Sequence, residues 1–130
     1  MRPLGDEPRE TVSQTIFERN GGFATVRKVV STFYDYVLED EVMAPYFTGI
    51  DMRRQIDHQS KFISAVMGGP GSYSDDHLQR VHARLGITHD AFLVMGSLLK
   101  EAMEDHDMAA ADVDAVMHEI VIREHLVVTA

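Results

Sequence analysis

The chain has no cysteine, no long hydrophobic run and few basic residues. Without cysteine it can form neither disulfides nor thiolate metal sites, and it has no cysteine nucleophile. No apolar run approaches the roughly 18 residues that a membrane span requires, and no signal-peptide pattern opens the chain. These absences are compatible with a cytoplasmic protein.

Net charge and length indicate which partners and how many domains to expect. Twelve Lys and Arg residues against 21 Asp and Glu residues give a formal net charge of −9. An acidic surface of this kind disfavours nucleic acid and anionic membranes as partners. The 130 residues, 45% of them hydrophobic, are enough for one domain with a core and one cofactor. The eight methionines suit either ordinary core packing or the walls of an irregular pocket.

The first part of the chain contains an irregular segment and two helical patterns. Residues 1–12 carry prolines and mixed charges without periodicity, which predicts a flexible N-terminal extension before a domain spanning 13–130. Thr11 or Ser13 is expected to cap a short helix through Glu18, which Asn20-Gly21-Gly22 would end. The next helix is expected over residues 23–38. Its apolar stripe consists of Phe23, Val26, Val30, Phe33 and Val37.

Tyr34 lies at the margin of that stripe, where a tyrosine usually packs its ring and leaves its hydroxyl in water. After an acidic segment, Phe47 stands at a helix–loop junction that Thr48-Gly49 closes with a turn.

A helix predicted over residues 51–67 carries two amides where apolar side chains are expected. Gln59 falls in the middle of its apolar face and Gln55 beside it, while His58 lies at the edge. A buried amide without partners costs on the order of 1–3 kcal/mol. Both amides therefore either bond neighbouring backbone or donate to a ligand beside this helix. The apolar members of the face are Met52, Ile56, Ile63, Val66 and Met67.

His82 lies within an apolar stripe of a short helix. Gly68-Gly69-Pro70 breaks the preceding helix, and from about Asp76 the apolar positions follow helical spacing until Gly86. A lone histidine on such a face is more often a satisfied core residue than a metal ligand, so its context must decide. The stripe consists of Leu78, Val81, His82 and Leu85.

Two further helices complete an all-α chain. Thr88 is expected to cap one that runs to about Glu104, and a turn at residues 105–107 leads to a last helix over 109–127. His125 lies at the edge of the last apolar stripe. The inward positions are predicted to be Phe92, Met95, Leu99, Ala102 and Met103, followed by Val113, Val116, Met117, Ile120 and Val121.

Several motifs in this order resemble the truncated haemoglobins of the first (N-type) group, with features of the cyanobacterial-type members. Each motif alone is weak, but their order and spacing are specific, and the resemblance covers nearly everything from Phe17 onward. The motifs are Gly21-Gly22, Phe33-Tyr34, Phe47, Gln55 with Gln59, Gly68-Gly69-Pro70 with Tyr73, and His82 before Gly86-Ile87 and Phe92.

The resemblance implies a two-over-two helical sandwich around haem b (iron protoporphyrin IX), with His82 as the proximal iron ligand. Tyr34, Gln55 and Gln59 would line the distal side and stabilise a bound gas. Phe62 and Ile63 occupy positions that shape an apolar gas tunnel in some members. The residues expected to contact the cofactor are Phe33, Phe47, Met52, Phe62, Ile63, Tyr73, Val81, Leu85, Ile87, Phe92 and His125.

Two histidines leave the coordination chemistry open. His58 matches a position where some cyanobacterial-type members carry a second iron ligand, so the iron would be either pentacoordinate or bis-histidine. To reach iron from the edge of its helix, His58 would require that helix to rotate or slide. His125 matches a position that in some members bonds covalently to a haem vinyl group.

The resemblance implies binding of the diatomic gases oxygen, nitric oxide and carbon monoxide. One hypothesis is an enzyme, a nitric oxide dioxygenase or peroxidase-like protein that detoxifies reactive species with an unidentified reductase. A second is reversible oxygen storage or sensing. A third is an electron-transfer haem protein, and a haem-free helical interaction module remains as the plain alternative.

Overall fold

The computed structural model describes residues 14–71 and 74–130, and every regular element in these two ranges is a helix. The predicted all-α class is therefore confirmed. None of the described helices is long and apolar enough to cross a membrane. The elements are α2 (Ile16–Arg19), α3 (Gly22–Glu39), the 3-10 helix η1 (Ala44–Phe47), α4 (Met52–Val66), α5 (Asp75–His82), α6 (His89–Asp105), α7 (Ala110–Val121) and α8 (Glu124–Val127).

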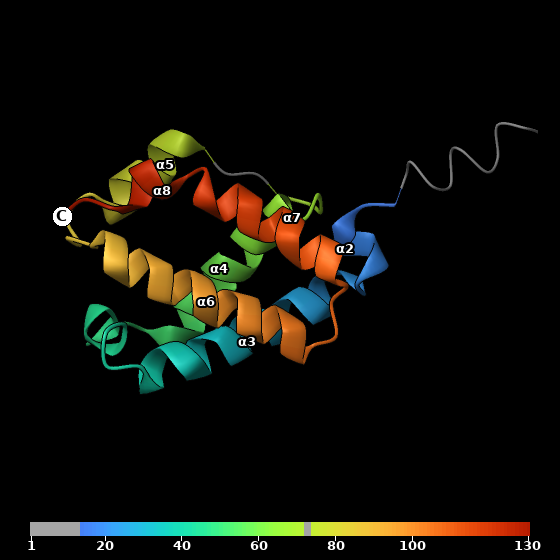
Figure 1. Cartoon of the computed structure of the whole chain (residues 1–130), viewed down its shortest axis with the longest axis horizontal. Coiled ribbons are helices and arrows are strands. Elements are labelled where there is room, and N and C mark those ends of the chain that lie inside the picture. The colour runs from blue at the N-terminus through green and yellow to red at the C-terminus, as the bar shows by residue number, and fades with distance from the viewer. Residues whose placement is uncertain (1–13, 72–73) are drawn as a thin grey trace, which may run out of the picture.

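Helices α3, α4, α6 and α7 form two packed pairs, α3 with α4 and α6 with α7. Helix α3 contacts α4 on one side and α6 on the other, and α6 in turn packs against α7 (Figure 1). Helix α5 lies beside the short α8, away from α3. This is the two-over-two helical sandwich that the sequence motifs imply.

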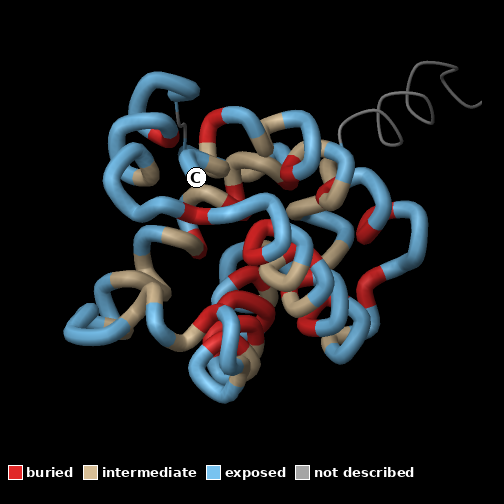
Figure 2. Tube along the Cα trace, turned by 60° about the vertical axis from the view of Figure 1, so that its left-hand side comes forward, coloured by how far each residue is buried: buried red, intermediate tan, exposed pale blue. Residues whose placement is uncertain are grey.

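Helix α3 contributes more side chains to the core than its apolar stripe predicts. Because α4 and α6 cover it from two directions, its buried arc also takes in Val29 and Tyr34. Phe23, placed inward from the sequence, is instead 38% exposed in the first turn of the helix beside the short α2. Figure 2 shows the buried positions gathered toward the middle of the molecule.

The chain enters the fold through a tightly capped turn. Thr15 caps α2 by accepting a hydrogen bond from the Glu18 amide, and the Glu18 carboxylate accepts one from the Thr15 amide. Helix α2 therefore starts at Ile16, later than the cap predicted at Thr11 or Ser13; those two residues lie outside the described ranges, as does the predicted extension 1–12.

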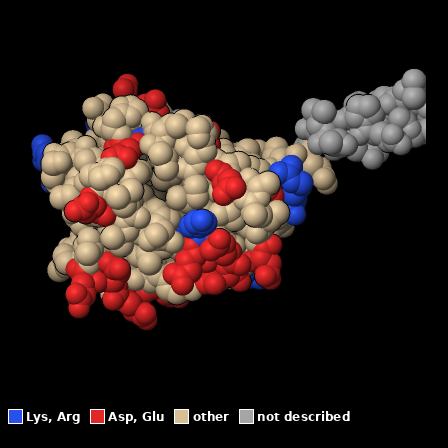
Figure 3. All heavy atoms as spheres, in the orientation of Figure 1, with Lys and Arg blue, Asp and Glu red and all other residues tan. Residues whose placement is uncertain are grey.

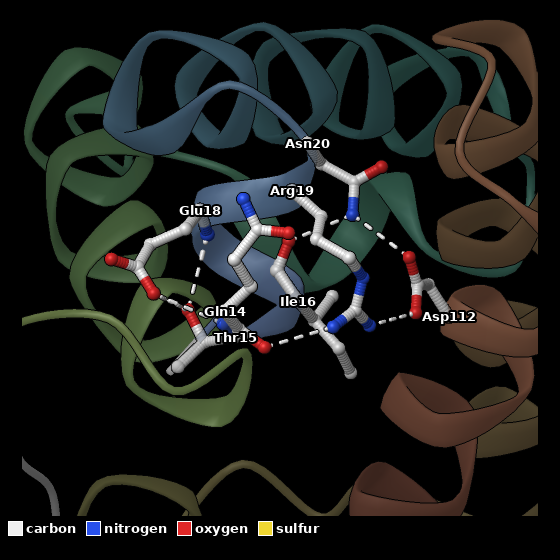
Figure 4. Close-up of polar contacts among 7 residues, drawn as sticks. All are labelled: Gln14, Thr15, Ile16, Glu18, Arg19, Asn20 and Asp112. Atoms are coloured by element: carbon white, nitrogen blue, oxygen red, sulfur yellow. Dashed lines mark hydrogen bonds and ion pairs between the residues drawn. The ribbon is translucent and has the colours of Figure 1, made fainter. Parts of the chain in front are cut away.

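A buried carboxylate ties α2 to α7 (Figure 4). Asp112 accepts hydrogen bonds from Arg19 Nη2 at 2.6 Å and Asn20 Nδ2 at 3.0 Å. Burial alone would raise the pKa of Asp112, but the two hydrogen bonds and the charge of Arg19 outweigh it together and lower the pKa. The carboxylate is therefore bound in its ionised form.

We expect Asp112→Asn to lower the free energy of unfolding by about 1–2 kcal/mol, because it removes the charge that Arg19 and Asn20 bind. Since a lowered pKa stabilises the fold only while the group stays ionised, the difference from the wild type should shrink as the pH falls below about 4. Urea unfolding at pH 7 and pH 3 measures both effects. Asp114→Asn, at an exposed position of the same helix, is the matched control, and an equal loss in both variants would contradict the assignment.

The end of the chain departs from the prediction of one helix over 109–127. Helix α7 ends at Val121, and α8 starts at Glu124 after a turn at Ile122 and Arg123. The break redirects the chain so that α8 packs on α5, which buries Leu126 and leaves Val121 54% exposed rather than inward. Tertiary packing decides this boundary, since no glycine or proline marks it.

Acidic side chains gather along the lower edge of the face shown in Figure 3, in keeping with the net charge of −9.

Helices α3 and α6 are linked near the C-terminal end of α6. Thr32 Oγ1 lies 2.9 Å from His106 Nε2, and the Tyr36 hydroxyl donates to Asp105. His106, the C-cap residue of α6, thus joins the two central helices.

Candidate functional site

A buried pair of polar side chains from α3 and α4 forms the first part of the site. Tyr34 is only 2% exposed, and Gln55 Nε2 donates a hydrogen bond to its hydroxyl oxygen at 3.1 Å. The expectation that this hydroxyl would lie in water is therefore wrong: Tyr34 is one of the most buried residues of α3. The structure also settles how Gln55 is satisfied, by a side chain of the neighbouring helix rather than by backbone.

The environment of Tyr34 keeps its hydroxyl protonated. Burial raises the pKa of Tyr34 well above its ordinary value of about 10, and the hydrogen bond from Gln55 offsets only part of that rise. A phenol oxygen that accepts from Gln55 retains its own proton for a second partner. Tyr34 is thus a neutral hydrogen-bond donor held in a dry environment.

Two aromatic rings hold Tyr34 in place. The ring centroid of Phe33 lies 4.9 Å from that of Tyr34, and that of Phe47 in η1 lies 5.5 Å away, both in edge-on geometry. Phe47 itself is half-buried. The predicted junction residue Phe47 and the predicted distal residue Tyr34 therefore lie side by side, although they come from different elements.

His82 ends α5 and has a defined tautomer. Its Nδ1 lies 2.7 Å from the carbonyl oxygen of Leu78, one turn earlier in the same helix. Because a carbonyl only accepts hydrogen bonds, Nδ1 carries the ring proton and Nε2 keeps a lone pair. A metal-bound histidine has this arrangement, with the second ring nitrogen donating to a carbonyl or carboxylate. The residues present therefore fit a group that binds through iron.

Three apolar residues lie near His82 in the sequence, one buried and two exposed. Helix α5 is shorter than predicted, and of its expected stripe only Leu78 is buried. Val81 and Leu85 are 49% and 46% exposed, so large apolar side chains flank His82 at the surface of the protein chain. A flat apolar cofactor bound by His82 would cover side chains of this kind.

The other predicted cofactor contacts fall into three groups. The groups differ in burial, and the exposed group lies on α5, the turn after it and α8. Tyr73 lies outside the described residues. The buried ones are Phe33, Ile63, Ile87 and Phe92, the half-buried ones Phe47, Met52 and Phe62, and the exposed ones Val81, Leu85 and His125.

The remaining polar candidates are less buried than Tyr34. Gln59 is half-buried, one turn after Gln55 on α4. His58 is exposed, and its Nε2 lies 3.5 Å from Arg54 Nε on the same helix. Ligation of iron by His58 stays a prediction, as does covalent attachment through His125, which lies on α8 next to α5.

Two buried polar residues were not predicted from the sequence. Ser60 and Ser64 are fully buried on α4. Their spacing of four places both on one helical face, and that spacing of small residues was the available signal. Ser64 Oγ donates to the carbonyl of Pro70 at 3.3 Å and so ties the turn after α4 back to the helix.

Comparisons with known proteins show the family of the chain. A model of the bacterial-like globin family matches residues 15–128. The group 1 truncated haemoglobin of Mycolicibacterium paratuberculosis is 31% identical over 112 residues, which cover 86% of this chain and 82% of that protein. A group 1 truncated haemoglobin of Nostoc sp. is 27% identical over 106 residues, which cover 82% of this chain and 90% of that protein.

Solved structures show the same fold. The truncated haemoglobin of Tetrahymena pyriformis in its Fe(III) form has a TM-score of 0.81 at 24% identity and covers 88% of this chain and 98% of its own. The 2/2 haemoglobin from Synechococcus sp., solved in the cyanomet state with covalently attached haem, has a TM-score of 0.82 at 24% identity and covers 90% of this chain and 100% of its own. The chain belongs to the bacterial-like globin family, among the group 1 truncated haemoglobins.

Proposed function

We propose that this protein holds haem b through His82 and uses Tyr34 and Gln55 to retain oxygen for reaction with nitric oxide. Family membership implies haem-based binding of diatomic gases. The single observation that carries the finer proposal is the buried hydrogen bond between Gln55 and Tyr34. It supports a site built for slow release rather than for delivery.

His82 and Leu78 form the proximal side of the proposed site. Haem iron, when bound, supplies an open coordination position for oxygen and other diatomic gases. The His82 Nε2 lone pair is available to the iron because Nδ1–H donates to the Leu78 carbonyl. That hydrogen bond also fixes the plane of the imidazole and increases its basicity.

Tyr34 is the main hydrogen-bond donor on the distal side of the proposed site. Its proton is free to point at a gas molecule because its oxygen already accepts from Gln55. In a site that excludes water, such a hydrogen bond contributes about 1 kcal/mol, and more if the acceptor carries charge. Tyr34 and the amides of Gln55 and Gln59 together are sufficient to slow oxygen release by about 100-fold.

Slow release favours chemistry on the retained oxygen. In the proposed reaction, ferrous protein, oxygen and nitric oxide yield ferric protein and nitrate. The iron loses one electron in each turnover, so a reductase that returns this electron is the implied partner. A protein for oxygen storage would instead need release within the time of demand.

Rapid mixing of the oxygenated protein with nitric oxide tests the proposal. We expect complete conversion to the ferric spectrum within the mixing time of the instrument, with one nitrate formed per protein. Slow or partial conversion, or nitrite as the main product, would leave oxygen storage as the better assignment. Reduction of the ferric product by a purified flavin reductase then tests whether turnover is sustained.

We also propose that the iron is five-coordinate before a gas binds, because His58 is exposed and contacts Arg54. The expected result is that His58→Ala leaves the ferric and ferrous absorption spectra unchanged. A low-spin spectrum of the wild type that becomes high-spin in His58→Ala would contradict this and favour bis-histidine ligation with an electron-transfer role.

The covalent attachment of haem through His125 is a further part of the proposal. Its support is the position of α8 beside α5, the helix that ends at His82. The intact mass of the haem-loaded protein after acid denaturation decides it: a mass equal to the chain alone would reject the bond, while a mass increased by one haem that returns to the chain mass in His125→Ala would establish it.

A further inference from the structure

Helix α5, which ends at His82, is attached to the fold through the last residues of the chain. Its main neighbour among the described helices is α8 (Figure 1). Leu78 on α5 and Leu126 on α8 are both buried, yet neither belongs to the main core cluster around α3. The α5–α8 pair is therefore a packing unit of its own, joined to the core by Val127 and Val128.

Arg123 and Glu124 make polar contacts with α5 and α6. At its first residue, Asp75 Oδ1 lies 4.0 Å from Arg123 Nε. Beyond its end, Glu124 pairs with His89 at the start of α6. These two contacts place the start of α8 near the first residues of both α5 and α6.

Thr129 binds the main chain on both sides of the turn that follows His82. Its amide donates to the Ile87 carbonyl at 3.0 Å, a bond that the Ala130 amide reinforces at 3.2 Å. Its hydroxyl Oγ1 donates to the carbonyl of His82 at 3.4 Å. The His82 carbonyl also accepts from the Leu85 amide at 3.1 Å, so the backbone of the histidine is bound from within the turn and from the tail.

We propose that Thr129 is a positioning residue for the proximal histidine: by binding the main chain of His82 and Ile87, it sets the orientation of the His82 imidazole toward iron. The inference rests on the proposed ligation of haem by His82. The side-chain bond from His82 Nδ1 to Leu78 orients the ring relative to α5. Thr129 orients the end of α5 relative to the core, and both are needed to define the direction of Nε2.

Three substitutions at one position separate the two donors of Thr129. Thr129→Ser keeps the amide and the hydroxyl, Thr129→Val loses the hydroxyl alone, and Thr129→Pro loses both. The preceding residue, Val128, has φ −75° and ψ 119°, which lies in the extended region that a residue before proline adopts. The series therefore grades the loss of contact without changing α5 itself.

The first measurement is the iron–histidine stretching band in the resonance Raman spectrum of the ferrous, gas-free protein. We expect it to broaden and move to lower frequency in the order Val, then Pro, with Ser equal to the wild type. The second is haem transfer from the loaded protein to an apomyoglobin acceptor. Its rate should rise about tenfold in Thr129→Pro, which corresponds to about 1.4 kcal/mol, and less in Thr129→Val.

The outcomes distinguish the inference from the function on which it rests. If the wild type shows no iron–histidine band, ligation by His82 fails and the inference fails with it. If the wild type shows the band and all three variants match it in frequency and width, the positioning role is overturned while the ligation stands. Should Thr129→Pro not fold, as judged by far-ultraviolet circular dichroism, the comparison of Thr129→Val with Thr129→Ser decides.

Amide hydrogen exchange of the haem-loaded variants separates positioning from plain stability. We expect faster exchange in residues 76–82 of Thr129→Pro and unchanged exchange in α3. Faster exchange across all helices together with an unshifted Raman band would show a general stabilising contact and overturn the inference.

Discussion

Replacement of His82 by alanine is expected to weaken haem binding by more than about 100-fold, since the loss of even a residue that only supports a metal ligand costs 10–100-fold. The variant loses the Nε2 lone pair that the Leu78 carbonyl orients. Titration of the purified chain with haemin, followed by the Soret band, measures the change. Added imidazole should restore part of the wild-type spectrum, because a free ligand can enter the space that the side chain leaves.

His77→Ala is the matched control for this variant. His77 is exposed on the same helix, and its backbone amide, not its ring, binds the cap residue Ser74. Its haemin titration should equal that of the wild type. A Soret band of equal strength in His82→Ala would contradict the assignment of the site, and the search would move to the other histidines of the described chain.

The second large effect is expected from Tyr34→Phe, which should raise the oxygen dissociation rate by about 10- to 100-fold. The substitution removes the hydroxyl that we propose donates to the gas, and it leaves the ring in its contacts with Phe33 and Phe47. It also leaves Gln55 without its acceptor, at a cost of about 1–3 kcal/mol to the distal side. Stopped-flow displacement of oxygen by carbon monoxide measures the rate.

Tyr36→Phe provides the control on the same helix. The Tyr36 hydroxyl donates to Asp105 on α6 rather than to Gln55, so oxygen dissociation should remain at the wild-type rate. Because burial raises the pKa of Tyr34 above its ordinary value of about 10, the wild-type rate should also stay constant from pH 6 to about pH 10. A rate that climbs through neutral pH, or one unaffected by Tyr34→Phe, would assign gas retention to another group.

The helix boundaries near strong caps and breaks are predictable from sequence. Thr88 caps α6 as predicted, and Asp51, placed at the start of the predicted helix, caps α4. Gly68 follows the end of α4 with a φ of +87°, a conformation that favours glycine. These signals are local, since each depends on a side chain and a backbone amide within one turn. The fold class follows from the same signals because no stretch favours a strand.

The sequence-based predictions that proved wrong concern contacts between segments far apart in the chain. The position of Tyr34 at the margin of a stripe predicts partial exposure, but burial depends on α4 and α6 covering α3 from two sides. The break between α7 and α8 depends on the docking of Leu126 near α5, which no residue at Ile122 announces. Thr129 carries no motif at all, because its role lies in hydrogen bonds to backbone more than 40 residues earlier, including one to His82.

In the candidate site, the resemblance to truncated haemoglobins indicated more residue roles than helical periodicity did. Helical spacing alone places His82 and Gln55 on inward faces and leaves a core role open for both. The structure adds the partner of each, Leu78 for the histidine and Tyr34 for the amide. A partner four residues away in the same helix can be anticipated from sequence, whereas a partner on another helix requires the fold.

The contact between Thr129 and His82 has a practical consequence for handling this protein in the laboratory. A purification tag or fluorescent fusion attached at Ala130 would disturb a residue whose neighbour, Thr129, bonds the backbone of the proposed iron ligand His82. A polyhistidine tag there would also bring competing imidazoles close to that side of the molecule. Helix α2, the first described helix, lies at the opposite end in Figure 1, so additions ahead of it should leave spectra and gas kinetics undisturbed.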